Sequence, residues 1–296
     1  MPMTFTSMLA PKGTSGSIAN WAGYSKLDLP VILEEAQYLI YEMLRVREMR
    51  TEWTFGVKVG YSGVALPDRY LDPLGPLYDV TNGRKILQTP QNDLQNLRSY
   101  EAVSGAFGTD PFSTSAGNPW VVVHKVGHDL TQSSTITISG STPVDVIDIN
   151  STYQIEPIDA DNFTLFRAGE PLAVTSVTGG GSSATYTGNR LVNGMPSTWS
   201  ILGTGFWFDI AHTDPCVYKH NYYRRPQLLS ASNPNNFLTD RYPTLLRVAT
   251  QAAAAEFMED DGKYQKHVAK LGALISSTII TDDLSLRGAS FGTDTP

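Results

Sequence analysis

The sequence predicts an α+β protein: a helical bundle built from both ends of the chain, a β region between them, and a small all-β barrel or sandwich inserted into that region. Three observations support this prediction. Apolar residues recur at helical spacing near both ends, over residues 29–50 and 237–280. Residues 52–100 contain short alternating strands broken by Gly and Pro. Between about residues 120 and 186, Lys and Arg are scarce and β-branched residues are abundant.

The N-terminal helix is predicted over residues 29–50. Asp28 is its expected N-cap, and Glu34 and Glu35 lie near the positive end of the helix dipole. The apolar positions at helical spacing are Ile32, Ala36, Leu39, Met43 and Val46. We expect this apolar face to pack on the helices at the C-terminus.

Two C-terminal helices, folded back on each other, are predicted over residues 237–280. Thr239 is the expected N-cap of the first helix, and Pro243 lies in its first turn, where a missing N–H costs least. The helical pattern breaks at residues 260–262 and then resumes. The alanine run at 252–255 lacks side-chain bulk, so another helix can approach closely.

The β region is predicted to be split by the inserted module. A short helix is expected at residues 91–98 in its first half. The predicted division is residues 1–117 and 189–296 for the main fold and 118–188 for the all-β module. Linker-like segments rich in Gly and Ser occur at both junctions.

Composition limits the possible functions. The net charge is −7, from 22 basic and 29 acidic residues, which argues against a broad phosphate-binding surface and suits a channel wall past which DNA slides. The single cysteine, Cys216, excludes an intrachain disulfide and fits a reducing cytoplasm. Neither a long apolar segment nor a signal-peptide pattern occurs, so a membrane-spanning or secreted protein is not expected.

The sequence offers no catalytic, cofactor or metal site, so we do not expect an enzyme. Phosphate-loop, dinucleotide-binding, serine-hydrolase and zinc-protease motifs do not occur. His124 and His128 lie on a predicted strand, where their spacing favours a solvated or hydrogen-bonded pair over a metal site. Asp159 and Asp161 resemble the start of a calcium loop but lack its glycine, so a turn is favoured. Cys216 is more consistent with a buried small hydrophobe than with a nucleophile.

One basic-aromatic cluster, YKHNYYRR, occupies residues 218–225. Interleaved Tyr and Lys or Arg residues suit stacking on nucleic acid. We favour the alternative of a strand whose alternate aromatic residues enter the core while its arginines pair with acids of a neighbouring subunit, because the surrounding charge is acidic.

Several motifs follow one another in a recognisable order. TFTSML at Thr4–Leu9 precedes the helix PVILEEAQYLIYEMLRVREMR and the strand WTFGVKV. PSTWSILGTGFWFDIA at Pro196–Ala211 is followed by YYRRPQLLS, an Asn/Pro linker, LTDRYP and the paired helices. This order resembles the head-to-tail adaptor (connector) proteins of short-tailed phages, over the whole chain except the insert.

By this resemblance the chain is a structural virion protein, assembled in the host cytoplasm and placed in the tail or neck. Twelve copies would form a ring that binds the portal, carries the tail nozzle and fibre proteins, and continues a channel through which DNA passes without specific binding. The expected inter-subunit residues are Arg224, Arg225, Ala252 and Ala253. No cofactor and no membrane partner are implied.

The insert contains VVVHKV, TITISG, DINSTYQI, DADNFTL and a final Gly-rich strand. This order is similar to the β-barrel module related to the first catalytic-cysteine half-domain of ubiquitin-activating enzymes, and comparable modules recur in phage tail proteins. The insert has no cysteine, so that chemistry is not implied. The alternative function is a virion-associated glycan-binding or glycan-cleaving protein that uses this module, and a cleft with paired carboxylates and exposed aromatic residues would favour it.

The C-terminal segment, residues 281–296, has few apolar residues and several Gly or Pro residues. It is predicted to leave the second helix and lie extended against the portal. Leu284, Leu286 and Phe291 are the expected apolar anchors, with Arg287 paired to an acid. The alternative is a tail folded back onto its own subunit.

Overall fold

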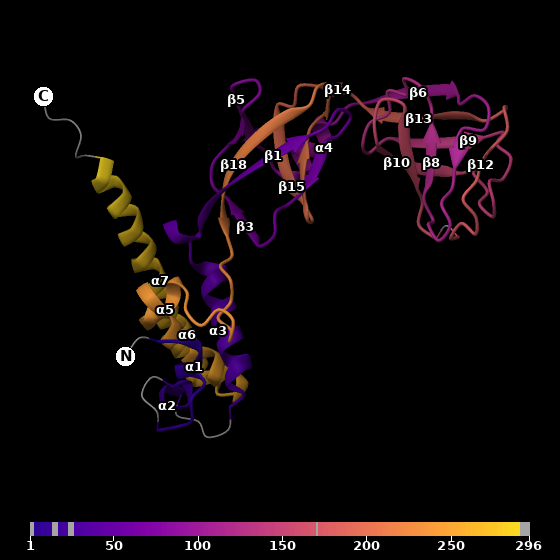
Figure 1. Cartoon of the computed structure of the whole chain (residues 1–296). Coiled ribbons are helices and arrows are strands. Elements are labelled where there is room, and N and C mark those ends of the chain that lie inside the picture. The colour runs from indigo at the N-terminus through magenta and orange to yellow at the C-terminus, as the bar shows by residue number, and fades with distance from the viewer. Residues whose placement is uncertain (1–2, 14–16, 23–26, 170, 291–296) are drawn as a thin grey trace, which may run out of the picture. The chain divides into compact units, whose positions relative to one another are not determined.

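The computed structural model describes residues 3–13, 17–22, 27–169 and 171–290, with side chains to residue 284 (Figure 1). The chain divides into two compact units. Unit 1 contains the described parts of Met1–Thr51, Arg69–Asp72 and Tyr222–Pro296, and unit 2 contains Glu52–Asp68 and Pro73–Asn221. Unit 1 is mainly helical and unit 2 mainly β-sheet, which confirms the predicted α+β class.

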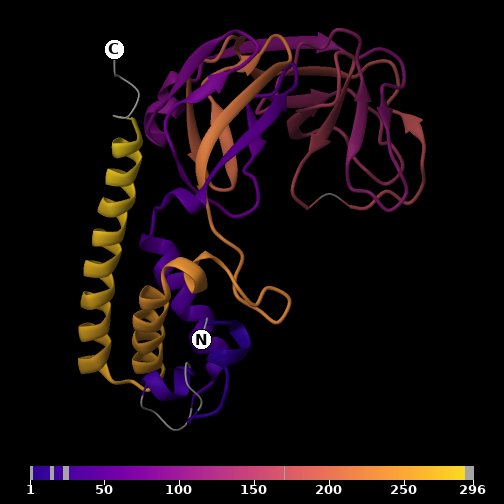
Figure 2. The ribbon, with the colours of Figure 1, turned by 60° about the vertical axis from the view of Figure 1, so that its left-hand side comes forward.

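Unit 1 is organised around one apolar core. Its helices are α1 Phe5–Met8, α2 Ile18–Ala22, α3 Leu29–Met43, α5 Phe237–Arg241, α6 Pro243–Phe257 and α7 Asp261–Ser290. α6 and α7 run antiparallel, and α3 packs on α6 (Figure 2). The core includes Ile32, Ile40, Leu246, Ala253 and Leu271. Each large apolar side chain buried there contributes about 1.5–3 kcal/mol.

The predicted N-terminal helix is correct at its start and too long at its end. The Asp28 side chain accepts a hydrogen bond from the backbone N–H of Val31 at 3.5 Å, as an N-cap does. The helix ends at Met43, because Leu44 adopts an extended conformation. Leu44 and Val46 remain buried in the same core, so the apolar pattern continues where the helix does not.

The first C-terminal helix begins earlier than predicted and is interrupted. Asn236, not Thr239, is the N-cap of α5, and Thr239 completes a capping box three residues later. A new helix, α6, then begins at Pro243, which lacks the N–H that would continue α5. Asp260 accepts a hydrogen bond from the N–H of Lys263 at 3.2 Å and supports the start of α7, as expected.

The first sheet of unit 2 combines strands from both sides of the insert. Its strands are β1 Arg50–Val57, β2 Gly63–Ala65, β3 Tyr70–Pro73, β4 Leu77–Asp79, β5 Arg84–Gln88, β15 Thr198–Leu202, β16 Gly205–Phe208 and β18 Cys216–Arg224. The order is β1-β18-β4-β5-β15-β16-β2, with β3 paired to β18. Its core is aromatic: Trp199 stacks on Phe206 at 4.2 Å between ring centroids, beside Phe208 and Tyr218.

The second sheet forms the all-β module. Its strands are β6 Tyr100–Ala106, β7 Phe112–Ser113, β8 Val121–His124, β9 Thr135–Ser139, β10 Thr152–Pro157, β11 Asn162–Phe166, β12 Thr178–Gly179 and β13 Thr185–Leu191, in the order β12-β7-β8-β11-β10-β9-β13-β6. Inward side chains alternate with outward ones and enclose a separate core. The sheet extends from Tyr100 to Leu191, beyond residues 118–188, because β6 and β7 precede residue 118 and the end of β13 follows residue 188.

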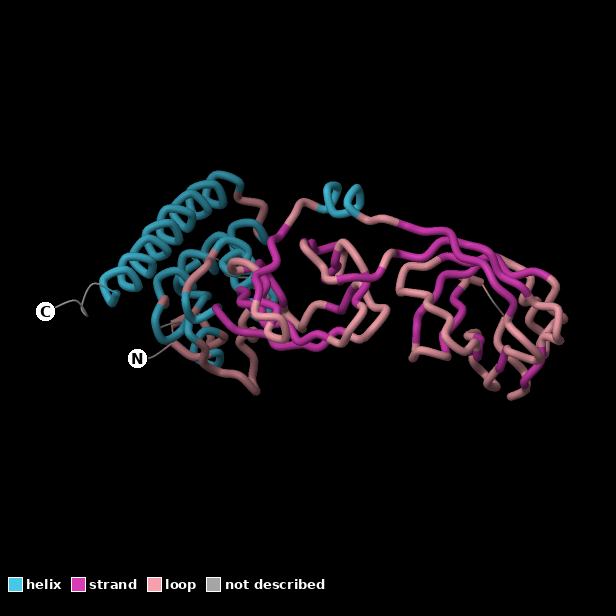
Figure 3. The backbone as a smooth tube through the Cα atoms, turned by 90° about the horizontal axis from the view of Figure 1, so that it is seen from above, coloured by secondary structure: helices cyan, strands magenta, loops and turns pink. Residues whose placement is uncertain are grey.

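Two smaller elements complete unit 2. Helix α4, Gln91–Leu97, confirms the predicted short helix and lies between β5 and β6 in the chain (Figure 3). Strands β14, Asn193–Gly194, and β17, Ala211–His212, pair in parallel.

Specific hydrogen bonds join the two sheets of unit 2. The N–H of Gln132 in the module donates to the Gly60 carbonyl at 2.7 Å, and its side-chain oxygen accepts from the N–H of Ser62 at 3.1 Å. The Tyr61 hydroxyl donates to the Pro157 carbonyl at 2.5 Å. Because three bonds converge on neighbouring residues, the junction has a defined geometry.

Two glycines give opposite expectations for stability. A Cβ on Gly188 in β13 would lie 2.1 Å from the Thr135 carbonyl oxygen and 2.7 Å from Ile136 Cα, both backbone atoms, so Gly188→Ala should destabilise unit 2 by about 2–3 kcal/mol. Gly272 in α7 has nothing within 4 Å of an added Cβ, so Gly272→Ala should stabilise unit 1 by about 0.5–1 kcal/mol. Urea unfolding of both variants tests this pair, and equal effects would contradict it.

Candidate functional site

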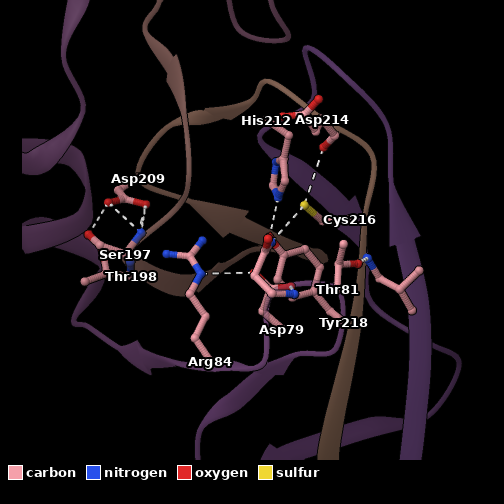
Figure 4. A network of polar contacts seen from close by, with 12 residues as sticks. Asp79, Thr81, Arg84, Ser197, Thr198, Asp209, His212, Asp214, Cys216 and Tyr218 are labelled. Carbon is pink, nitrogen blue, oxygen red and sulfur yellow. Dashed lines mark hydrogen bonds and ion pairs between the residues drawn. The ribbon is translucent and has the colours of Figure 1, made fainter.

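A buried polar network lies in the first sheet of unit 2, at the ends of β4, β17 and β18 (Figure 4). His212 is 0% exposed, with Nδ1 at 2.7 Å from the Tyr61 carbonyl oxygen and Nε2 at 2.6 Å from the Tyr218 hydroxyl. Since a carbonyl only accepts, Nδ1 carries the proton and Nε2 accepts from Tyr218. Burial lowers the pKa of His212, so the imidazole is neutral.

Asp79 supplies the negative charge of this network. It is 0% exposed and accepts hydrogen bonds from the backbone and side chain of Asn82 at 3.0 and 2.9 Å, and from Arg84 Nε at 3.1 Å. Burial alone would raise the pKa of this carboxyl, but the bonds from Asn82 and the charge of Arg84 outweigh it and lower the pKa. The carboxylate is therefore ionised, and both of its oxygens accept hydrogen bonds.

Cys216, His212 and Asp79 together invite comparison with a nucleophilic triad, and their geometry argues against it. The Cys216 thiol donates to the Asp214 carbonyl at 3.4 Å, and burial raises its pKa. Both nitrogens of His212 are already bonded to other groups, so neither can activate the thiol. Cys216 is the buried small residue that the sequence predicts, and the network fixes the strand ends.

A second carboxylate, Asp209, serves a turn in the same region. It accepts hydrogen bonds from the Ser197 N–H at 3.0 Å, the Ser197 hydroxyl at 2.6 Å and the Thr198 N–H at 3.3 Å (Figure 4). These bonds hold the segment that leads into β15. Its role is also structural.

His124 and His128 each make a hydrogen bond within the module. His124 Nδ1 lies 3.0 Å from Asn162 Oδ1, and His128 Nε2 lies 2.9 Å from the Asp159 carbonyl oxygen. Asp159 accepts from the N–H groups of Asp161 and Asn162 at 2.9 and 2.8 Å, as its turn interpretation requires. Within the described part of the chain, His, Cys, Asp and Glu form no group of three or more that could hold a metal.

The basic-aromatic cluster follows the strand interpretation. β18 alternates buried and exposed residues, with Tyr218 and Tyr222 at 0% and 4% exposure. Arg225 lies over the Tyr38 ring at 5.6 Å. Arg224 is exposed and makes no ion pair with the residues that the structure describes. The aromatic half of the prediction is confirmed, and the pairing of the arginines with another subunit stays a prediction.

The inter-subunit role predicted for Ala252 and Ala253 is wrong. Their exposed fractions are 0% and 4%, and Ala254 and Ala255 are at 0% as well. α6 is covered by α2, α3 and α7 of the same chain. The small side chains do allow close helix approach, but the approaching helices belong to this subunit.

The prediction that the C-terminal segment from Thr281 is extended is also wrong for the residues that the structure describes, because α7 continues to Ser290. Buried Asp282 anchors this part of the helix: its carboxylate accepts the backbone N–H of Arg47 at 2.9 Å and pairs with Arg47 Nε at 3.2 Å. Asp283 lies 3.7 Å from Arg50. The sequence pattern shows no such long-range partners.

Of the predicted anchors in this segment, Leu284 is 61% exposed. Leu286 and Arg287 lie on the helix backbone beyond it, and Phe291 lies outside the described residues. Ile280, four residues before Leu284 and so on the same helix face, is 59% exposed. Together these two form an apolar strip on α7.

Unit 2 also contains a groove that the sequence does not indicate. We call it the aromatic groove; its volume is about 450 Å³, and it is lined by Tyr100, Gln132, Ser133, Gln154, Ile155, Glu156, Phe166 and Trp207. These residues come from β6, β10, β11, β16 and one loop. Aromatic residues within apolar strand segments look like core residues in a sequence, so the convergence of these three on one surface has no signal there.

None of the described helices combines the length and apolar character that a bilayer crossing requires. No protein family matches the chain, and no curated protein does. Comparison with solved structures returns a similarity to the phage phi92 endosialidase, at 12% sequence identity and a TM-score of 0.24. The match covers 50% of this chain and 22% of that chain, so it spans less than a quarter of the endosialidase's length. A likeness this weak does not establish a shared fold and supplies no function.

The buried histidines predict acid sensitivity of unit 2. Burial lowers the pKa of His212 and lowers that of His220 to about 4, from an ordinary 6.5. The unfolded chain therefore binds protons that the folded chain excludes, so stability is complete above about pH 6.5 and falls towards pH 4, by on the order of 3 kcal/mol for His220. Urea unfolding at several pH values measures this. His220→Phe should weaken the dependence, and an unchanged pH profile would contradict the assignment.

The two acids of α7 should differ in importance. Asp282→Ala removes a buried carboxylate that accepts the Arg47 N–H and pairs with the Arg47 side chain, and it should cost about 1–3 kcal/mol. Asp283→Ala removes only a partly exposed ion pair and should cost less than about 1 kcal/mol. Hydrogen exchange of α7 together with denaturant unfolding measures both. Equal effects would show that Asp282 does not anchor the helix.

Proposed function

We propose that this chain is a structural protein of a phage virion, an adaptor that forms a ring beneath the portal and continues the channel for DNA. The observation that carries the proposal is that most motifs of the adaptor resemblance, although far apart in the sequence, meet in unit 1, while WTFGVKV and PSTWSILGTGFWFDIA lie together in the first sheet of unit 2. TFTSML, the PVILEE helix, the YYRRPQLLS segment, LTDRYP and the paired helices all contribute to unit 1.

Direct contacts join these motifs. The N–H of Phe5 donates to the Pro234 carbonyl at 2.9 Å. The N–H of Leu229, in the YYRRPQLLS segment, donates to the Gln37 side chain of α3 at 2.7 Å. Their order therefore describes one packed unit, which supports a shared architecture more strongly than separate local patterns do.

The surface of unit 1 supports association. The apolar strip of Ile280 and Leu284 suits a docking contact, because exposed apolar side chains gain free energy when a partner covers them. Exposed Arg224 suits an acidic partner across a subunit contact. A heterologous contact repeated around an axis closes into a ring, for which the resemblance implies twelve copies. The portal on one side and the nozzle and fibre proteins on the other are the proposed partners.

Portal capture tests this function. Mixed with the portal protein of the same phage, the chain should cap the portal's outer end as closed rings, visible by electron microscopy and countable by mass photometry. The double substitution Ile280→Ser and Leu284→Ser should weaken capture at least about tenfold, since it removes apolar area from the docking contact.

A matched control replaces two equally exposed apolar residues of unit 2, Leu87→Ser and Val126→Ser, at 65% and 69% exposure. This control should bind the portal as the unaltered chain does. A chain that folds and never joins the portal would overturn the proposed function. Normal capture by the Ile280 and Leu284 variant would remove only the apolar strip from it.

A further inference from the structure

Alternation along β10 directs two polar side chains of the aromatic groove outward. Gln154 and Glu156 project outward from β10, between buried Tyr153, Ile155 and Pro157. Phe166 of β11 is the direct cross-strand partner of Gln154, and its side chain is 48% exposed. An amide, a carboxylate and an aromatic ring therefore share one side of the groove.

Trp207 has a constrained position in this groove. A Cβ on Gly63 would lie 2.5 Å from the indole ring, and one on Gly205 would lie 2.4 Å from Nε1. The ring thus occupies space that only glycines leave open. Arg98 lies 5.3 Å from its ring centroid and donates two hydrogen bonds to the Phe208 carbonyl, which restrains the ring further. Such an aromatic side chain is held in place before any ligand arrives.

Two further groups complete the lining. Tyr100 of β6 is 50% exposed. The side-chain oxygen of Gln132 is used by the N–H of Ser62, while its NH₂ group has no partner among the described residues. The groove therefore offers three aromatic rings, two amides and one carboxylate, fixed by the hydrogen bonds that join the two sheets.

The charge of the groove selects the chemical class of ligand. Its lining contains no Lys or Arg, and Arg98 over Trp207 already donates to the Phe208 carbonyl, so phosphates and nucleic acids meet little counter-charge there. The neighbouring outward side chains of β9, β10 and β13 are hydroxyls and amides: Thr135, Thr137, Thr152, Thr187 and Asn189. Glu156 disfavours anionic ligands. A pyranose has an apolar C–H face that packs on an aromatic ring and hydroxyls that bond to amides and a carboxylate.

We propose that the aromatic groove binds a neutral sugar of a glycan, through Tyr100, Phe166 and Trp207 on its C–H faces and Gln132, Gln154 and Glu156 on its hydroxyls. Glu156 is the one carboxylate of the lining, whereas glycoside cleavage uses a pair. The groove is therefore a binding site and not a hydrolytic one. This inference does not depend on the adaptor role, because the site lies wholly in unit 2.

Saturation-transfer NMR on the full-length chain tests the inference, with maltotriose, N-acetylated chitotriose and lactose as neutral probes and sialyllactose as the anionic one. At least one neutral probe should receive saturation at its ring protons, and sialyllactose should receive less. Tyr100→Ala and Phe166→Ala should each weaken that binding by roughly three- to tenfold. Gln154→Ala should weaken it without removing an aromatic contact.

Two control variants remove exposed aromatic residues outside the groove. Tyr78→Ala on β4 and Trp120→Ala in the module, at 41% and 51% exposure, should leave binding unchanged. Circular dichroism confirms that each variant is folded before titration. Absence of transfer to every neutral probe at millimolar concentration would overturn the proposal. So would binding that survives Tyr100→Ala and Phe166→Ala, since the sugar would then lie elsewhere.

Discussion

Unit 1 depends on one buried amide. Gln37 of α3 is 0% exposed; its side chain accepts from the backbone N–H of Leu229 at 2.7 Å and donates to the Leu33 carbonyl at 3.1 Å. The chain between β18 and α5 has no regular structure, so this N–H has no strand or helix partner of its own. Leaving it buried without an acceptor would cost about 1–3 kcal/mol. The Gln37 amide therefore fixes where the segment between β18 and α5 enters the core. This position in turn sets where α5 and α6 begin to pack.

The two units use polar groups in different ways. In unit 1, the amide of Gln37 and the carboxylate of Asp282, near the C-terminal end of α7, join elements that are distant in sequence. In unit 2 a neutral histidine, a tyrosine and an ionised aspartate pin strand ends around an aromatic core. Both ring nitrogens of His212 and the Cys216 thiol already have hydrogen-bond partners, so the imidazole does not activate the thiol in this network.

Local physics made much of the fold predictable. Caps and apolar periodicity located the starts of α3 and the existence of α4, α6 and α7, and the scarcity of charge located the module. The errors arose where distant contacts decide the local structure. α7 continues past Thr281 because Asp282 meets Arg47, a partner hundreds of residues earlier, and no local pattern records such a partner. The alanines of α6 have the composition of an interface, and only the folded chain shows that its own helices cover them.

The aromatic groove was invisible for a related reason. Tyr100, Phe166 and Trp207 come from three different strands, and Phe166 and Trp207 stand next to core residues in the sequence. Only the junction hydrogen bonds of Gln132 bring their exposed faces to one surface. Alternation determines which face of a strand a residue occupies, whereas the approach of two sheets determines what that face meets.

The module is attached through the strands that are first and last in the chain, β6 and β13, which pair antiparallel with Tyr100 opposite Leu191. The chain therefore enters and leaves the module at neighbouring positions. Once the module has folded, it connects the flanking strands of the first sheet across a short distance, as a short loop would. Parallel pairing of Leu87 with Thr198 then closes a much smaller effective ring, which lowers the entropic cost by about 1–2 kcal/mol. Folding of the module first would speed assembly of the sheet that contains it. An exchanged insert would therefore need to match the spacing of the two attachment points and to supply partners for Gly60, Tyr61 and Ser62, whereas the rest of the first sheet could stay as it is.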